Sequence, residues 1–307
     1  MFDFSYIGSG PYCYSNCLAM IMGGDAPPVA VIETVSGSPF GMQWIGGMMP
    51  FFDPCGWNPE IGVERALAVL GWTAETSSGG GADAALGRLA SCTARGPVMA
   101  GPLEMGHLRY QPGMTGPIGA DHYVIVLGIH DGHVISHDPQ GYPFASLPSA
   151  EFAKAWEADT IDYGEPYTMR MNFTQSGSVG VEEALTASLP HAVDWLRADP
   201  DHALPPGSSG NGDAALALAA SLENGRSESL YEHLVHFAVR VGARRAADAA
   251  ACLRGIGRTE AAAIMFRQAR LIGSLQQSLA TGDDRAAAES LRALAPTYDI
   301  LRAELRH

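Results

Sequence analysis

The chain changes character near residue 177, and this change constrains its fold more than any other feature. Residues 1–176 are rich in Gly and Pro and mix short β-branched and aromatic runs with helical stretches. Residues 177–307 instead contain successive segments with helical periodicity, separated by Gly or by Asp, Asn and Ser. We therefore predict two domains, an α+β domain over 1–176 followed by an all-helical domain over 177–307. The polar stretch 199–213 is predicted to be a loop within the second domain.

Helical patterns come first in the predicted α+β domain, and strand patterns follow. The predicted helices are CLAMIMGG (17–24), NPEIGVERALAVLGW (58–72) and GGADAALGRLASC (80–92). The predicted strands are PVMAG (97–101), HYVIVLGI (122–129), HVISHD (133–138) and PYTMRMNF (166–173). This order favours an α+β fold over a doubly wound parallel sheet.

The charge of the chain limits its partners. Its 307 residues include 33 acids against 19 bases, 18 of them Arg and one Lys154, which gives a formal net charge of −14. Such a field repels a nucleic-acid backbone or an anionic membrane, so neither is an expected partner. The hydrophobic content of 47% is ample for buried cores.

The cysteines and the N-terminal segment indicate the compartment. Five scattered cysteines are too few for a disulfide framework, and one would be left over. The N-terminus lacks the basic start and apolar run of a signal peptide, and no stretch approaches the roughly 20 apolar residues of a membrane span. We predict a cytoplasmic protein, in which a free thiol can stay reactive.

Cys13 is the predicted nucleophile. It stands in SGPYCYSNCLAM, where a Gly-Pro turn leads into a helix, and the N–H groups of a helix N-terminus stabilise a thiolate. Cys17 lies one turn deeper on the same helical face, and its apolar neighbours favour a small core residue that lines the site.

His122 and Asp138 are the predicted partners of Cys13. They open and close two successive predicted strands, so the connection between the strands decides whether they share a face. A two-residue Asp131–Gly132 turn would pair His130 with His133 and place Asp138 on the face opposite His122. A three-residue loop with Gly132 at positive φ would pair Ile129 with His133 and bring both to one face, so we predict the longer loop.

The three residues together would perform nucleophilic acyl chemistry. His122 would take the Cys13 proton, and Asp138 would fix the imidazole tautomer while the thiolate attacks an acyl carbon. The Cys13 backbone N–H and a second donor would bind the oxyanion. The sequence leaves that donor open among Ser9, Ser15 and Asn16. No metal or cofactor is expected.

The same segments resemble a known family. CYSNCLAM resembles the C-x-x-x-C-L-x-M helix start of the papain-like peptidase domains that cut bacteriocin leader peptides, and HYVIVLGIHDGHVISHDPQG resembles their histidine strand with its Asp-Pro-x-x-G close. The resemblance implies that Cys13 is the nucleophile and that His122 and Asp138 complete the triad. The family's glutamine, about six residues before the nucleophile, is replaced here by Ile7, so the oxyanion hole must be built differently.

A closer resemblance is to the butirosin biosynthesis protein H family, which is similar in fold. PVMAGPLEMGHLRYQPG resembles that family's strand and L-P-Y-like element, with Leu108, Arg109 and Tyr110 at these positions, so Tyr110 is predicted to line the site. The resemblance implies a papain-like domain with a helical C-terminal domain. It also implies a cysteine acyltransferase that moves an acyl or aminoacyl group from an acyl carrier protein thioester to an amine of a small natural-product intermediate.

Two other readings of the site stay open. The same triad suits a cysteine peptidase, amidase or thioesterase, in which water replaces the amine. A papain-like scaffold could also serve as a binding module without catalysis.

Three further groups have ordinary structural interpretations. His130, His133 and His137 could suggest zinc, but they surround a hairpin without a cysteine pair and are expected to be solvated. Cys55 is expected in a loop, with a place near the site as the alternative. A set of arginines is expected to form a solvated face with nearby acids, or else to bind an acidic carrier protein: Arg240, Arg244, Arg245, Arg254 and Arg258.

Overall fold

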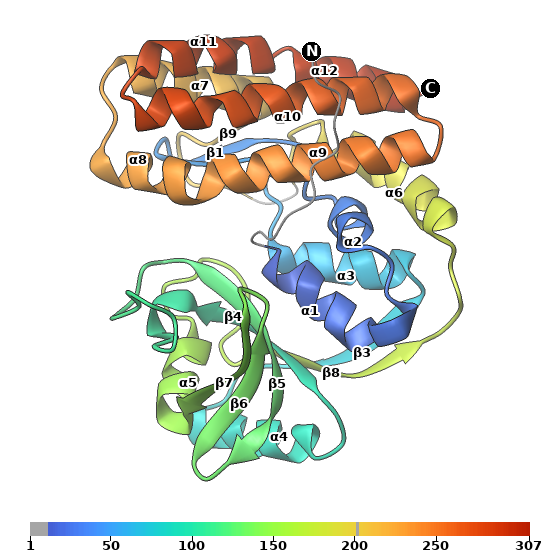
Figure 1. Ribbon diagram of the computed structural model, residues 1–307, viewed down its shortest axis with the longest axis vertical. Helices are drawn as coiled ribbons and strands as arrows, with labels where there is room; N and C mark the ends of the chain where they lie inside the picture. The colour runs from blue at the N-terminus through green and yellow to red at the C-terminus, as the bar shows by residue number, and fades with distance from the viewer. Residues whose placement is uncertain (1–11, 201–202) are drawn as a thin grey trace. The chain divides into compact units, whose positions relative to one another are not determined.

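The computed structural model describes residues 12–200 and 203–307 and shows a mixed α and β protein with a helical C-terminal region (Figure 1). The chain divides into two compact units. The sheet unit comprises residues 12–29 and Leu70–Ser178, and the helical unit comprises Ala30–Val69 and Val179–His307. Residues 30–69 thus group with the C-terminal helices, whereas the sequence places them in the first domain.

The sheet unit is built on a six-stranded antiparallel sheet with strand order β3-β8-β4-β5-β6-β7. The strands are β3 (Trp72–Ser77), β4 (Val98–Glu104), β5 (Asp121–His130), β6 (His133–Asp138), β7 (Tyr142–Pro148) and β8 (Met169–Gln175). Four of the six correspond to predicted strands. The other two, β3 and β7, carry exposed polar positions and lie at the two edges, where a strand needs little apolar patterning.

Helices pack against this sheet. The helices are α1 (Cys13–Met22), α4 (Ala82–Thr93) and α5 (Ser149–Glu157), with short 3₁₀ turns at Gly23–Asp25 and Met105–His107. Val124 of β5 lies in a core with Leu89 of α4 and Phe152 of α5, whereas the neighbouring Tyr123 ring meets Tyr14 of α1 edge-on at 6.3 Å. α1 therefore packs against β5 at Tyr123, whereas α4 and α5 pack around Val124.

The helical unit combines a bundle with a small sheet. Its helices are α2 (Val29–Val35), α3 (Pro59–Val69), α6 (Val181–Trp195), α7 (Asn211–Glu223), α8 (Glu228–His233), α9 (Val239–Gly255), α10 (Thr259–Ala280), α11 (Asp284–Leu294) and α12 (Thr297–Leu305), with a π-helical turn at Leu234–Ala238. The sheet has the order β2-β1-β9, from β1 (Gln43–Ile45), β2 (Met49–Phe51) and β9 (Ser209–Gly210). Phe40, Met42 and Phe52 share one buried core with the C-terminal helices, which explains why residues 30–69 belong to this unit.

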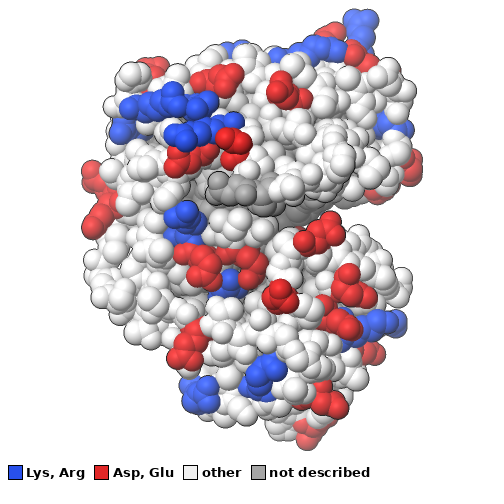
Figure 2. All heavy atoms as spheres, turned by 180° about the vertical axis from the view of Figure 1, so that it is seen from behind, with Lys and Arg blue, Asp and Glu red and all other residues white. Residues whose placement is uncertain are grey.

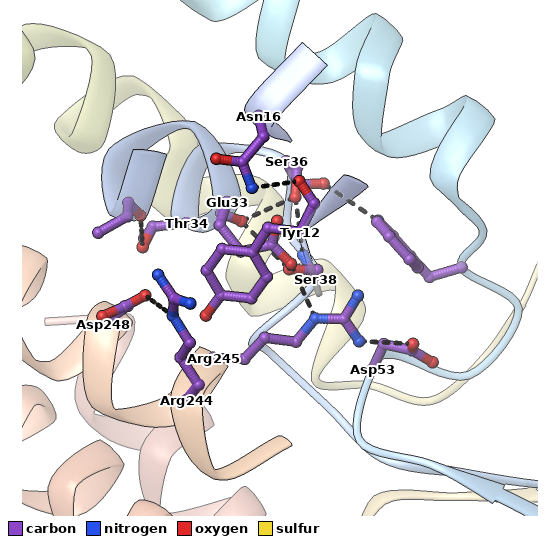
Figure 3. Close-up of polar contacts among 12 residues, drawn as sticks. Tyr12, Asn16, Glu33, Thr34, Ser36, Ser38, Asp53, Arg244, Arg245 and Asp248 are labelled. Carbon is purple, nitrogen blue, oxygen red and sulfur yellow. Dashed lines mark hydrogen bonds and ion pairs between the residues drawn. The ribbon is translucent and has the colours of Figure 1, made fainter. Parts of the chain in front are cut away.

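A buried ion-pair network also ties residues 30–69 to α9 (Figure 3). Arg245 of α9 lies between Glu33 and Asp53, with Nε 2.8 Å from Glu33 Oε1 and Nη1 2.8 Å from Asp53 Oδ2. Gln43 Nε2 donates to Asp53 Oδ1 at 2.5 Å, and Ser38 Oγ donates to Glu33 Oε1 at 2.7 Å. The interpretation of Arg245 as part of a solvated face is therefore wrong, because two buried carboxylates hold its guanidinium inside the unit.

Charged side chains of both signs lie on the surface of the described residues (Figure 2). On the face shown in Figure 2, acidic and basic side chains of the described residues lie interspersed. Within residues 12–200 and 203–307, no helix combines the length and the apolar character that a membrane span requires.

Candidate active site

The β5–β6 hairpin sets the positions of His122 and Asp138. Its loop is the two-residue Asp131–Gly132 turn, with φ of 48° and 76°, and it pairs His130 with His133. The predicted three-residue loop is therefore wrong. Two successive residues at positive φ form the turn whose twist matches that of the flanking strands, and Asp-Gly suits it.

A β-bulge supplies the register that the predicted loop was meant to provide. Val126 pairs with Ser136 and Gly128 pairs with Ile135, so Leu127 is an extra residue in β5. Beyond the bulge Ile125 pairs with His137, and the next step along the ladder brings Asp138 opposite Val124. This is the position that places Asp138 diagonally from His122 on one face.

His122 and Asp138 form a buried contact. His122 Nε2 lies 2.9 Å from Asp138 Oδ1, and the two residues are 1% and 4% exposed. The Asp138 carboxylate accepts three further hydrogen bonds. Oδ1 accepts from the Gln140 backbone N–H at 2.7 Å, and Oδ2 accepts from Tyr110 Oη at 2.9 Å and Gln111 Nε2 at 2.8 Å.

These donors keep Asp138 ionised. Burial alone would raise the pKa of its carboxyl, but the hydrogen bond and charge of His122, with the donors of Gln140 and Tyr110, hold that pKa below its usual value. Burial and the Asp138 charge raise the pKa of Tyr110, so its phenol stays protonated and donates.

The contact also determines which nitrogen of the His122 ring carries hydrogen. Because Nε2 faces an ionised carboxylate, it is the nitrogen that carries hydrogen. Nδ1 is then the nitrogen that can accept a proton from a nucleophile.

Cys13 is the first residue of α1 and is half-buried. The preceding Tyr12 is the N-cap, and its carbonyl accepts the Asn16 backbone N–H and Asn16 Nδ2, each at 2.8 Å. The edge-on contact of Tyr14 with Tyr123 joins the residue after Cys13 to the residue after His122. The start of α1 is thus packed against the start of β5.

Cys17 lies one turn further along α1 and is fully buried. Burial raises the pKa of its thiol well above the ordinary value, and electrostatic interactions with Cys13 and Asp138 raise it further. Cys13 and Asp138 are therefore both close enough to Cys17 to act on its charge. The burial agrees with the predicted core position of Cys17.

The structure describes two of the three predicted oxyanion donors. Ser15 is fully buried, and the Asn16 side-chain amide donates to the Tyr12 carbonyl at the start of its own helix. Ser9 and Ile7 lie outside the described residues.

None of the remaining candidates has a hydrogen bond to His122 or Asp138 among the contacts of the described residues. Cys55 is buried in the helical unit, where burial raises the pKa of its thiol. His130 and His133 lie exposed at the hairpin, and His137 Nδ1 accepts the Phe144 backbone N–H at 3.1 Å. Within the described ranges, no three His, Cys, Asp or Glu residues gather as a metal site would require.

Two donors to Asp138, Gln111 and Gln140, were not predicted from the sequence. Gln111 is only 5% exposed and directly follows Tyr110 in the segment PVMAGPLEMGHLRYQPG. Its position beside Tyr110 could have indicated that it lines the site. Gln140 donates through its backbone, which no side-chain pattern reveals.

Comparison with known proteins gives two similarities. The YobF C-terminal domain family matches residues 205–306, which lie in the helical unit. A segment of 161 residues is 34% identical to the uncharacterized protein YobF of Bacillus subtilis (strain 168) and covers 52% of each protein. The chain thus spans about half the length of this curated relative.

Proposed function

We propose that this protein is a papain-like cysteine acyltransferase with Cys13 as nucleophile, His122 as general base and acid, and Asp138 as the residue that orients the imidazole. The observation that supports this most is the buried 2.9 Å contact between His122 Nε2 and Asp138 Oδ1, in the unit where Cys13 begins α1. A buried carboxylate on one ring nitrogen leaves the other nitrogen as a base of fixed orientation.

The first half-reaction forms an acyl-enzyme. His122 Nδ1 takes the Cys13 thiol proton, and Sγ forms a bond to the thioester carbonyl carbon. The tetrahedral intermediate then collapses as the carbon–sulfur bond to the donor breaks. His122 returns the proton to the departing thiolate, which leaves as a free thiol.

The second half-reaction transfers the acyl group. An amine attacks the Cys13 thioester, His122 takes the amine proton, and a carbon–nitrogen bond forms. The bond from Sγ to the acyl carbon breaks, and His122 returns its proton to the Cys13 sulfur. Asp138 stays ionised throughout and stabilises the imidazolium formed in each half.

The substrate classes are those implied by the resemblance of the segment around Leu108, Arg109 and Tyr110 to the butirosin biosynthesis protein H family. We propose an acyl carrier protein thioester as donor and a small amine as acceptor. Hydrolysis by the same triad is the alternative, in which water attacks in place of the amine.

Intact-protein mass spectrometry after mixing with a panel of acyl thioesters tests the proposal. We expect an acyl mass increment in the wild type, in Cys17→Ala and in Cys92→Ala, and none in Cys13→Ala. Cys92 is a matched control because it is a second half-buried thiol of the sheet unit. An increment that survives Cys13→Ala contradicts the proposed nucleophile.

Adding amines to the acylated protein separates transfer from hydrolysis. Release of the acyl group as an amide supports the acyltransferase. Release as the free acid at the same rate with and without amine favours the hydrolase. No increment with any thioester would contradict the acyltransferase and favour a peptidase or a binding module.

A further inference from the structure

Glu104 is a fully buried carboxylate outside the proposed triad, at the last position of β4. Its Oε1 accepts the backbone N–H groups of Gly106 at 3.0 Å and Ile118 at 2.9 Å. Its Oε2 accepts the backbone N–H of Gly119 at 2.9 Å and the Thr160 hydroxyl. A buried carboxylate is tolerated only when donors compensate its lost hydration, and here four donors do so.

Three of these donors belong to one segment, the 105–120 loop between β4 and β5. Gly106 lies at the start of this loop, and Ile118 and Gly119 lie near its end. The Met105 backbone N–H also donates to the Ala120 carbonyl at 2.9 Å. The Glu104 carboxylate therefore binds the two limbs of the loop to each other.

The two limbs approach closely where Glu104 holds them. A Cβ atom on residue 106 would come within 1.9 Å of the Gly116 carbonyl oxygen, so only glycine fits there. Burial opposes ionisation of Glu104, but the donors from Ile118, Thr160, Gly106 and Gly119 outweigh it and lower the pKa of the carboxyl. The Glu104 carboxylate, which we call the clamp of the 105–120 loop, is thus charged at neutral pH.

The 105–120 loop carries the two side chains that hold Asp138. Tyr110 and Gln111 both donate to Asp138 Oδ2. The intervening backbone is fixed by Leu108 N–H to Met105 O and Gln111 N–H to Leu108 O, each at 2.9 Å, and Leu108 is fully buried. A continuous set of hydrogen bonds therefore runs from Glu104 through the loop to Asp138 and on to His122.

We infer that Glu104 is a positioning residue, whose carboxylate fixes the 105–120 loop so that Tyr110 and Gln111 hold Asp138 against His122. The inference rests on the proposed function, because it gives Glu104 its role through the proposed triad. It predicts that loss of the Glu104 carboxylate impairs the reactivity of Cys13, although the described donors to Glu104 belong to the 105–120 loop and to Thr160.

The test measures the rate of Cys13 alkylation by iodoacetamide from pH 5 to 9, read by peptide mass spectrometry. Glu104→Gln keeps the size of the side chain but turns one acceptor oxygen into an N–H₂ group that faces backbone donors. We expect its rate at neutral pH to fall by between about tenfold and a hundredfold, with the pH profile moved toward that of an ordinary thiol.

A double-mutant cycle separates positioning from general stability. In an Asp138→Asn background, Glu104→Gln should change the alkylation rate less than twofold, because its effect passes through Asp138. Leu89→Ala is the matched control, since it removes core volume from α4 of the same unit. We expect Leu89→Ala to lower the melting temperature without moving the pH profile.

The outcomes distinguish this inference from the proposed function. If Asp138→Asn lowers the rate but Glu104→Gln does not, or if their effects are additive, the inference is overturned and the proposed function stands. If Cys13 in the wild type reacts as an ordinary thiol and Asp138→Asn has no effect, the proposed function fails. Should Glu104→Gln not fold, Thr160→Val is the second variant, because it removes the hydroxyl of an exposed residue that donates to Glu104. An alkylation rate equal to that of the wild type would then overturn the inference.

Discussion

Asp138 lies 2.9 Å from His122 because one extra residue in β5 shifts the register between them. Without the bulge at Leu127, the Asp131–Gly132 turn would place Asp138 on the other face of the hairpin. The local disruption of the ladder is thus what brings the two side chains together. Bulges commonly re-aim side chains in this way.

Asp138→Asn should slow formation of the Cys13 acyl-enzyme by on the order of a hundredfold or more. The amide can present hydrogen to His122 Nε2, which favours the wrong tautomer, and it no longer stabilises the imidazolium. Asp131→Asn is the matched control, because Asp131 lies exposed in the same hairpin and Asn tolerates its positive φ. Stopped-flow measurement of acyl-enzyme formation checks both variants, and equal rates for the two would rule out the assigned role of Asp138.

The lowered pKa of Asp138 predicts a pH dependence of stability. The folded state keeps the carboxylate ionised to lower pH than the unfolded chain, in which the pKa of an Asp is about 3.9. The stabilisation is therefore present above that value and is lost as pH falls through the lower pKa of the folded state. We expect the wild type to lose free energy of unfolding below about pH 4.

Urea denaturation at several pH values between 7 and 3 measures this loss. Asp138→Asn should be less stable at pH 7, and its stability should fall less steeply at low pH, because it has no carboxylate to protonate at this position. Glu104 has a lowered pKa and so contributes with the same sign. Parallel curves for wild type and Asp138→Asn would show that this carboxylate is not coupled to folding.

Cys17 should resist modification in the folded protein. Its thiol is fully buried and its pKa is raised, so at pH 7 it holds almost no thiolate. Brief treatment with iodoacetamide should label Cys13 well before Cys17, and urea should make the two equally reactive. Peptide mass spectrometry reads both sites in one sample. Labelling of Cys17 before Cys13 would show that Cys13 is not the reactive thiol.

Much of the sheet unit could be predicted from the sequence, because periodicity and turn residues act locally. The predicted strand 133–138 coincides with β6, and the other three predicted strands overlap β4, β5 and β8. Cys13, predicted to stand at a helix N-terminus, is the first residue of α1, and the predicted helix 17–24 overlaps the rest of α1. The predicted hairpin loop was wrong because the β-bulge at Leu127 could not be predicted from the sequence. The only residue there that is typical of a bulge is Gly128.

Contacts between distant segments could not be predicted. Tyr110 and Gln111 reach Asp138 across 28 and 27 positions of the chain, through a loop whose path depends on the buried Glu104. The grouping of residues 30–69 with the helical unit likewise depends on packing of Phe40 and Phe52 with helices more than a hundred residues away. Neither relationship has a periodic signal in the sequence.

Arg245→Met should destabilise the helical unit by about 3–5 kcal/mol, because it leaves the buried Glu33 and Asp53 carboxylates without their cation. Arg240→Met is the matched control, since Arg240 lies exposed on the same helix. Its guanidinium donates a hydrogen bond to the His236 backbone carbonyl. Its effect should stay within about 0.5 kcal/mol. Urea denaturation followed by tryptophan fluorescence compares the two.

Adding Glu33→Gln and Asp53→Asn to Arg245→Met should restore part of the lost stability, because the loss comes from unpaired charge. If the triple variant is no more stable than Arg245→Met, the guanidinium instead contributes mainly through its packing on Trp57, whose ring centre lies 5.4 Å away.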